Sequence, residues 1–194
     1  MIQELFKLDY RLFFFINGKF HNDLLDLILP FFRNKFFWSP LYLFIIAFLL
    51  LNFRKKGIII ILSMILAVTI SDQLSSSIIK PIFHRDRPCN DIYLQEYVRQ
   101  LVSCGNGFSF PSSHASNHFA IAILFSFLFF QKYKWIFPLS LLWAGSIAYS
   151  QVYVGVHYPS DILAGAICGS LIGLLMGFWC NRTIVLLSKK NNFK

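Results

Sequence analysis

Five long apolar stretches restrict this chain more than any other feature of its sequence. They cover residues 36–53, 58–79, 112–131, 135–150 with an extension through Val154, and 158–180. A helix needs about 20 residues to cross roughly 30 Å of hydrocarbon, and most of the stretches approach that length. Because 56% of the 194 residues are hydrophobic and 14% are charged, a soluble domain of this size could not bury so much apolar side chain. We predict an all-α integral membrane helical bundle that forms one domain over residues 1–194.

The N-terminal 35 residues predict a further helix at the membrane surface. Five apolar residues recur there at helical spacing beside two basic ones, which suits an amphipathic interfacial helix. They are Leu5, Leu8, Leu12, Phe15 and Ile16, with Lys7 and Arg11. Residues 22–32 are also largely apolar, but a helix of that length covers only about 16 Å. This segment could dip into the membrane or complete a span with its flanks, so we expect five to six transmembrane helices and an N-terminal interfacial helix.

Basic residues gather in the loops 52–57 and 131–134 and in the C-terminal tail. Alternating the spans puts all three groups on one side, which the positive-inside rule assigns to the cytoplasm. Residues 80–110 and the turn 150–157 then face outward. The net charge of +9 does not indicate nucleic-acid binding, because the chain has no long basic run. Short basic clusters suit contacts with anionic lipid headgroups or with phosphate.

Three polar clusters share the outward face in this topology, although none of them was used to derive it. They are Lys80–Pro88, which contains Arg85 and Arg87; Pro111–His114; and Ser150–Asp161, which contains Gln151 and His157. Fixed cations neutralise a phosphate, and one imidazole can attack phosphorus while another protonates the leaving oxygen. Asp161 follows His157 by four residues and can hold that imidazole in its attacking tautomer. Together the clusters favour phosphoryl transfer.

Each cluster taken singly also has a structural interpretation. His157 and Asp161 could simply begin a helix, since an acidic residue in a first turn is common. Lys80 and Arg87 could be interface anchors whose charged ends reach the headgroups. The Pro-Ser-Ser-His segment at 111–114 could be only an N-terminal cap. It is their joint presence at one face that favours a reaction.

The three clusters resemble the signature of the type 2 phosphatidic acid phosphatase superfamily. The motifs are Lys80-x6-Arg87-Pro88, then Pro111-Ser112-Ser113-His114, then Ser150-Gln151-x5-His157-x3-Asp161, and they cover about residues 58–180. That superfamily includes bacterial phosphatases of undecaprenyl pyrophosphate, phosphatidylglycerophosphate and lipid A. The resemblance implies a metal-independent enzyme without a cofactor. It also implies a helical bundle in the bacterial inner membrane whose site opens toward the periplasm or exterior.

Carried over by motif position, the resemblance implies that His157 is the nucleophile, that Asp161 orients it and that His114 is the general acid. The implied phosphate-binding residues are Lys80, Arg87, Ser112, Ser113 through its backbone amide, Ser150 and Gln151. Two positions depart from the pattern: Ser113 stands where glycine is usual, and Gln151 where an arginine usually grips phosphate. Glutamine donates a hydrogen bond but brings no charge, so we expect weaker phosphate affinity, partly offset by Arg85.

Other residues allow further interpretations. His114 and His118 stand four apart and could hold a metal from one helix face, but no third ligand has a suitable position, so His118 is expected to line the site or satisfy local hydrogen bonds. Asp72 lies in an apolar stretch and should pair with a basic or hydroxyl group near the site. In an oxidising exterior, a Cys89–Cys104 disulfide would close a loop of about 16 residues, worth about 3 kcal/mol in the chain-entropy model.

The sequence therefore predicts a membrane phosphatase that removes the terminal phosphate of a lipid phosphate or pyrophosphate through a phosphohistidine. Its partners would be that lipid and the surrounding membrane lipids. A lipid phosphotransferase with the same site is the first alternative. A non-catalytic carrier of an anionic lipid or of phosphate is the second, although it gives no reason for two histidines and an orienting carboxylate. The sequence leaves the identity of the lipid and the oligomeric state open.

Overall fold

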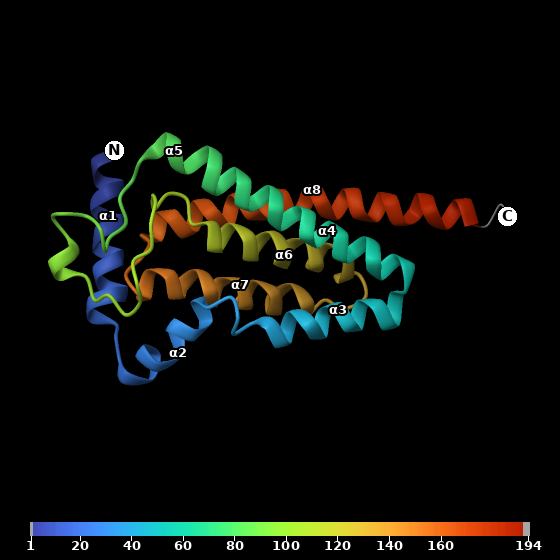
Figure 1. Ribbon diagram of the computed structural model, residues 1–194, viewed down its shortest axis with the longest axis horizontal. Coiled ribbons are helices and arrows are strands. Elements are labelled where there is room, and N and C mark those ends of the chain that lie inside the picture. The colour runs from blue at the N-terminus through green and yellow to red at the C-terminus, as the bar shows by residue number, and fades with distance from the viewer. Residues whose placement is uncertain (1, 192–194) are drawn as a thin grey trace.

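The residues that the computed structural model describes, 2–191, form helices and the segments that connect them, and no strand occurs among them (Figure 1). The longest connection, residues 84–112, contains one short 3-10 helix, η3 (Gln95–Tyr97). Each of the five apolar stretches forms a helix, as predicted. The helices are α3 (Ser39–Phe53), α4 (Lys55–Asp72), α6 (Ser113–Phe129), α7 (Ile136–Tyr153) and α8 (Pro159–Asn191). The last helix is longer than expected, because residues 181–191 contain no helix breaker.

Two helices are long and apolar enough to cross a membrane, Lys55–Phe83 and Pro159–Lys189. The first is continuous because α4 passes through a π-helical segment, η2 (Gln73–Ile79), into the short α5 (Lys80–Phe83). The helices α3 and α6 are shorter but also apolar. Many large hydrophobic side chains on the outer faces of these helices are exposed, among them Leu51, Leu62 and Leu175. An apolar outer face is what a bundle surrounded by lipid requires.

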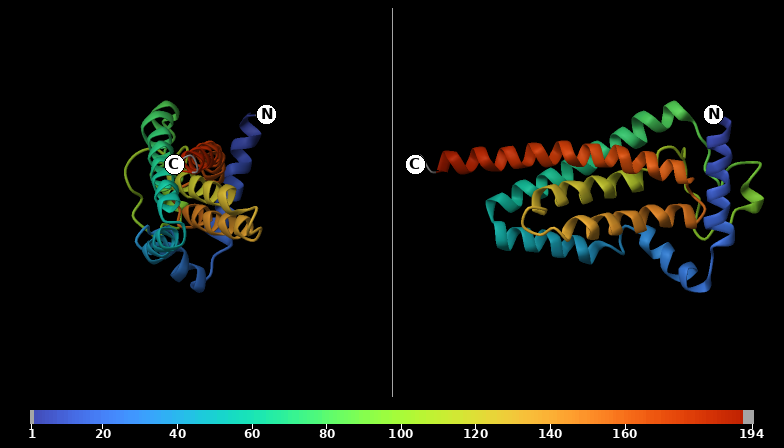
Figure 2. Two further views of the ribbon diagram at one scale, coloured as in Figure 1. Left: turned by 90° about the vertical axis from the view of Figure 1, so that its right-hand side faces the viewer. Right: turned by 180° about the vertical axis from the view of Figure 1, so that it is seen from behind.

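The N-terminal residues form two separate helices, α1 (Ile2–Phe14) and α2 (Asp23–Arg33), joined through the π-helical η1 (Phe15–Lys19). Figures 1 and 2 show α1 running across one end of the bundle, nearly at right angles to α6, α7 and α8. The helix α2 has 11 residues and packs against α7 near the same end. At about 1.5 Å per residue it is too short to cross a bilayer on its own.

The bundle has two chemically different ends. The connections α3–α4 and α6–α7, together with the C-terminus, lie at one end, and these are the basic loops of the sequence (Figure 1). The segment between α5 and α6, the turn between α7 and α8, and α1 lie at the other end (Figures 1 and 2). The helix order therefore brings the three polar clusters to one end, as the loop charges predicted.

The contact between α6 and α8 is the most extensive in the bundle, and it depends on small residues. Glycines recur at every fourth position of α8, at 165, 169, 173 and 177. A Cβ atom at Gly165, Gly169 or Gly173 would overlap a backbone oxygen of α6, that of Ser112, Ser116 or Ala120. The two backbones can approach this closely only because these positions carry no side chain.

We predict that Gly169→Ala destabilises the protein by about 1–3 kcal/mol, because the new methyl group would force α8 away from the backbone of Ser116. The matched control is Gly145→Ala on α7, where nothing lies within 4 Å of the added Cβ. Thermal unfolding in detergent measures both variants. Equal stability of the two would contradict the importance of the α6–α8 contact.

Candidate active site

His157 and Asp161 form the centre of the polar end, and both are almost fully buried. The imidazole Nδ1 lies 3.4 Å from the Asp161 carboxylate and 3.2 Å from the Ser109 hydroxyl. Because Ser109 donates its hydroxyl proton to Asp161, it can only accept from the imidazole. Nδ1 therefore carries the proton, and the lone pair of the neutral ring is on Nε2. An imidazole held in this way presents Nε2 as a nucleophile.

The turn between α7 and α8 positions this pair. The backbone oxygen of Gln151 accepts from the amides of Val156 and His157, which folds the chain back at the end of α7. Gly155 adopts φ +87° in this turn, a conformation that side-chain-bearing residues rarely take. The Asp161 carboxylate then accepts from the backbone amide of Tyr158 at 2.8 Å, which fixes it at the start of α8.

The pKa of His157 is lowered from 6.5 to about 4, mainly because burial disfavours the charged ring. Asp161 acts in the opposite direction through its hydrogen bond and its charge, whereas Arg87 and Lys80 lower the pKa further. Both cations therefore lie within electrostatic range of the imidazole. The ring is neutral at physiological pH, as an attacking nitrogen must be.

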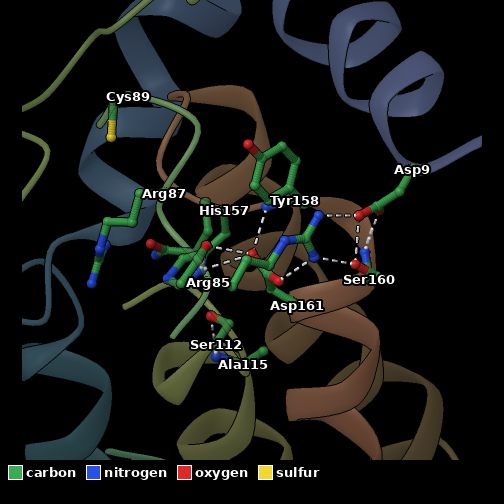
Figure 3. Close-up of polar contacts among 12 residues, drawn as sticks. Asp9, Arg85, Arg87, Cys89, Ser112, Ala115, His157, Tyr158, Ser160 and Asp161 are labelled. Atoms are coloured by element: carbon green, nitrogen blue, oxygen red, sulfur yellow. Dashed lines mark hydrogen bonds and ion pairs between the residues drawn. The ribbon is translucent and has the colours of Figure 1, made fainter. Parts of the chain in front are cut away.

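Arg85 neutralises Asp161 from the side away from His157. Its guanidinium donates to Asp161 at 2.8 Å and to Asp9 of α1 at 2.6 Å, and it stacks over the ring of Tyr158 (Figure 3). Asp9 also accepts from the amide and hydroxyl of Ser160. Two carboxylates thus already hold Arg85, and its supporting role at the phosphate stays a prediction.

Lys80 and Arg87 approach the centre from α5 and from the segment that follows it. Arg87 donates from Nε to the backbone oxygen of Gly107 at 3.2 Å, and its terminal nitrogens have no partner within residues 2–191. Burial lowers the pKa of Arg87, and the positive charge of Arg33 lowers it further. Arg87 thus keeps a charge that no carboxylate pairs with directly, which suits an anion site.

The serines of the second and third motifs have other partners. Ser112 is the N-cap of α6, and its hydroxyl accepts from the amide of Ala115 at 3.4 Å. Ser113 bonds the hydroxyls of Ser75 and Ser76 on η2. Ser150 is fully buried and donates to Ile147 on its own helix. Ser112 keeps its own hydroxyl proton to donate, whereas Ser150 already donates within α7, so the phosphate contacts of these two side chains stay predictions. The backbone amide of Ser113 stays available within the described residues.

Gln151 is buried at the end of α7 and contacts a residue that the motifs do not contain. Its Oε1 accepts from the Nε of Arg33, the last residue of α2, at 3.2 Å. The Nε2 of Gln151 is buried and has no hydrogen-bond partner among the residues that the structure describes. An arginine from the N-terminal region thus lies beside the position where the third motif departs from the family pattern.

His114 stands in the first turn of α6, within electrostatic range of His157, Arg33 and Lys80. The two motif histidines are therefore at the same end of the bundle. His118 is engaged elsewhere: its Nδ1 lies 2.8 Å from the backbone oxygen of His114 and its Nε2 lies 3.0 Å from the Tyr42 hydroxyl. The carbonyl can only accept, so Nδ1 donates to it and Nε2 accepts from the Tyr42 hydroxyl. Both ring nitrogens of His118 are therefore engaged, and neither is free to bind a metal.

The structure also bears on two expectations for residues away from the His157–Asp161 pair. Asp72 accepts from the side-chain amide of Asn117 at 3.0 Å, and its charge lies within electrostatic range of Lys80, a basic group of the first motif. Cys89 and Cys104 form a disulfide with their Cα atoms 5.9 Å apart, in the segment that also carries Arg87.

Sequence reasoning missed Ser109, Asp9 and Arg33. Ser109 stands two residues before the second motif and had no pattern of its own. Asp9 interrupts the apolar face of α1 and is buried there. An acidic residue on such a face needs a partner, and this was the signal that the sequence offered. Arg33 lies 118 residues from Gln151 along the chain, and no local pattern relates the two.

Known proteins are similar to this chain over most of its length. Residues 56–184 match the family described as the PAP2 superfamily. The chain is 36% identical over 184 residues to a lipid A 4'-phosphatase of Bacteroides thetaiotaomicron, covering 92% of this chain and 79% of that protein. It is 30% identical over 173 residues to an undecaprenyl-diphosphatase of Sulfolobus acidocaldarius, covering 89% of this chain and 75% of the relative.

The fold also has a counterpart among solved structures. The crystal structure of a transmembrane PAP2 type phosphatidylglycerolphosphate phosphatase from Bacillus subtilis superposes with a TM-score of 0.73. The likeness covers 92% of this chain and 87% of that one at 22% sequence identity. At that identity the likeness bears on the fold alone.

We predict that Arg85→Ala lowers the free energy of unfolding by about 3–5 kcal/mol, because it leaves the buried carboxylates of Asp9 and Asp161 without their shared cation. The control Lys7→Ala breaks an exposed pair with Glu4 and should cost about 0–1 kcal/mol. Thermal or denaturant unfolding in detergent measures both. A similar small loss in both variants would count against the buried cluster.

We also predict that His157 stays neutral, with Nδ1 protonated, down to about pH 5. Its pKa is lowered to about 4, so the neutral ring is present above that pH and is lost as the pH falls through it. NMR of 15N-labelled histidine in detergent measures the titration, with the signal assigned by its absence in His157→Gln. A midpoint near the ordinary 6.5 would show that the ring is not buried as described.

Proposed function

Because this chain belongs to the PAP2 superfamily, whose characterised relatives here are membrane lipid phosphatases, we propose that it removes the terminal phosphate of a lipid phosphate or pyrophosphate through a phosphohistidine on His157. One observation carries this proposal. A buried imidazole is hydrogen-bonded at Nδ1 to an Asp161–Ser109 pair, and two cations without direct carboxylate partners, Lys80 and Arg87, lie within electrostatic range of it.

In the first step, Nε2 of His157 attacks phosphorus and the bond from phosphorus to the lipid oxygen breaks. His114 donates a proton to that leaving oxygen, so that a neutral alcohol or a lipid phosphate departs. The bound Nδ1 proton stays between His157 and Asp161, whose carboxylate stabilises the charge that the ring acquires. The products of this step are the free lipid and a phosphohistidine.

In the second step, water attacks the phosphohistidine and the phosphorus–nitrogen bond breaks. His114, now neutral, accepts a proton from that water, which restores both histidines and releases inorganic phosphate. Arg87, Lys80 and the backbone amide of Ser113 would hold the equatorial oxygens, where charge accumulates in the transition state. Protein groups supply every charge in this scheme, so the proposed reaction needs no metal.

A lipid substrate follows from where the site lies. We place α3, the Lys55–Phe83 helix, α6, α7 and α8 across the membrane and α1 in its outer interface, with the basic loops in the cytoplasm. The site then lies at the outer surface of the inner membrane. There a phosphorylated headgroup can enter while its hydrocarbon chains stay in the bilayer.

The relatives suggest two substrate classes. Their names specify a lipid A 4'-phosphatase and an undecaprenyl-diphosphatase, which act on a phosphomonoester and a diphosphate respectively. Among these two, the lipid A relative is the more similar, at 36% identity over 92% of the chain. We therefore infer that a phosphomonoester on a saccharolipid is the favoured substrate, with a polyprenyl diphosphate as the second candidate.

We predict that His157→Ala abolishes turnover and that Asp161→Asn lowers kcat by about 10⁴-fold, since the amide would favour the wrong tautomer of the imidazole. Phosphate release by the purified protein in detergent measures both, with thermal unfolding as a check on folding. Full activity in a folded His157→Ala protein would eliminate the mechanism.

We predict that phosphate is released in EDTA and without an added acceptor, and fastest from lipid A. The panel compares lipid A, undecaprenyl pyrophosphate, phosphatidylglycerophosphate and phosphatidic acid under the same conditions. A requirement for an acceptor lipid would instead identify a phosphotransferase. Loss of activity in EDTA that added metal restores would contradict the metal-independent scheme.

A further inference from the structure

The helix α2 is fixed on α7 next to the site, although it lies outside the region that matches the family. Asp26 of α2 accepts from the hydroxyl of Tyr153 at 2.6 Å and forms an ion pair with Arg99. Leu25, Leu29 and Phe32 pack against the end of α7. These contacts hold the last turn of α2 in one place relative to the turn that carries His157.

Arg33 is the last residue of α2, and its side chain is directed to the site by one hydrogen bond. Its Nε donates to the Oε1 of Gln151 at 3.2 Å. The backbone oxygen of Gln151 in turn accepts from the amide of His157, so Arg33 is bound to the residue that shapes the catalytic turn. Its two terminal nitrogens have no partner among residues 2–191, which leaves the fork of the guanidinium free for an anion.

The charge of Arg33 lies within electrostatic range of the charge of Arg87. It is the largest Coulombic influence on the pKa of Arg87, which burial lowers first and Arg33 lowers further. Arg33 also lies within electrostatic range of His114. Two arginines within this range repel each other, and a phosphate bound by both would remove that repulsion.

A second, independent feature points to a ligand at this position. The Nε2 of Gln151 is buried without a partner in the described part of the chain, while Oε1 of the same amide is used by Arg33. A buried donor without an acceptor costs about 1–3 kcal/mol, and a bound anion would satisfy it. The unsatisfied amide of Gln151 and the free terminal nitrogens of Arg33 thus belong to two side chains that are hydrogen-bonded to each other.

We propose that Arg33, oriented by Gln151, is a phosphate-binding residue that supplies from α2 the charge that Gln151 lacks. The proposal rests on the proposed function, because it concerns the same phosphate site. Arg33 and Arg87 would bind the phosphate from two directions, and the amide of Gln151 would donate to it. The helix α2 is then part of the substrate site, and its residues 23–33 take part in phosphate recognition.

The decisive variant is Arg33→Gln, which removes the charge and keeps a polar side chain of moderate length. We expect KM for the lipid phosphate and Ki for inorganic phosphate to rise about 10- to 100-fold, the usual effect of losing a charge-assisted hydrogen bond. The matched control is Lys35→Gln, which removes an exposed charge two residues away and should leave both constants unchanged. If Arg33→Gln does not purify as a folded protein, Arg33→Met replaces it.

A charge-transfer variant separates phosphate binding from the packing of α2. In Arg33→Gln/Gln151→Arg the guanidinium moves to α7, and we expect KM and Ki to return to within about threefold of the wild-type values. An unchanged Ki in Arg33→Gln would overturn the proposal. A raised Ki that the double variant does not recover would also overturn it, since Arg33 would then act through packing.

The proposed function and the role of Arg33 can fail separately. Phosphate release by wild-type protein, and its loss in His157→Ala, tests the function alone. Inorganic phosphate as a probe tests Arg33 alone: it should raise the Tm of wild-type protein and raise it much less in Arg33→Gln. Equal protection of both proteins would refute the role of Arg33 whether or not the wild type turns over a lipid.

Discussion

The close contact between the backbones of α6 and α8 is the constraint on which the rest of the structure depends. Glycines at every fourth position of α8 allow it, and the amide of Ser112 then reaches the backbone oxygen of Asp161 at 3.0 Å. The start of α6, with His114, is thereby held against the turn that carries His157. Since lipid offers no hydrophobic driving force between helices, close van der Waals packing of this kind is what fixes such a site in a membrane.

The arginines at this end of the bundle differ in which groups neutralise their charge. Arg85 is held by Asp9 and Asp161, so it stabilises the buried carboxylate that orients the imidazole. Arg87 has no direct carboxylate partner in the described residues, and the same holds for Arg33. The distinction is electrostatic: the charge of Arg85 is used within the protein, whereas the charges of Arg87 and Arg33 are available to an anion. A sequence motif shows the residues but not which of them is already paired.

Much of the fold could be predicted because its signals are local or extend over a whole helix. Each apolar stretch is near the length of a span, and the basic loops alone grouped the polar clusters at one end. The local hydrogen bonds of Ser112, which precedes a helix, and of Ser150, which lies within one, are likewise typical of serine at such positions. The glycines of α8 were also visible in the sequence. The Arg33–Gln151 and Asp9–Arg85 contacts could not be predicted, because they join segments 118 and 76 residues apart.

The bonds from Asp9 to Ser160 have a consequence for biogenesis. They connect α1 with α8, which is synthesised much later, across 151 residues of chain. Asp9 therefore lacks Ser160 until the start of α8 has been made, and until then Arg85 and water are what can satisfy its carboxylate. The packing of α1 across the end of the bundle is thus completed late in synthesis.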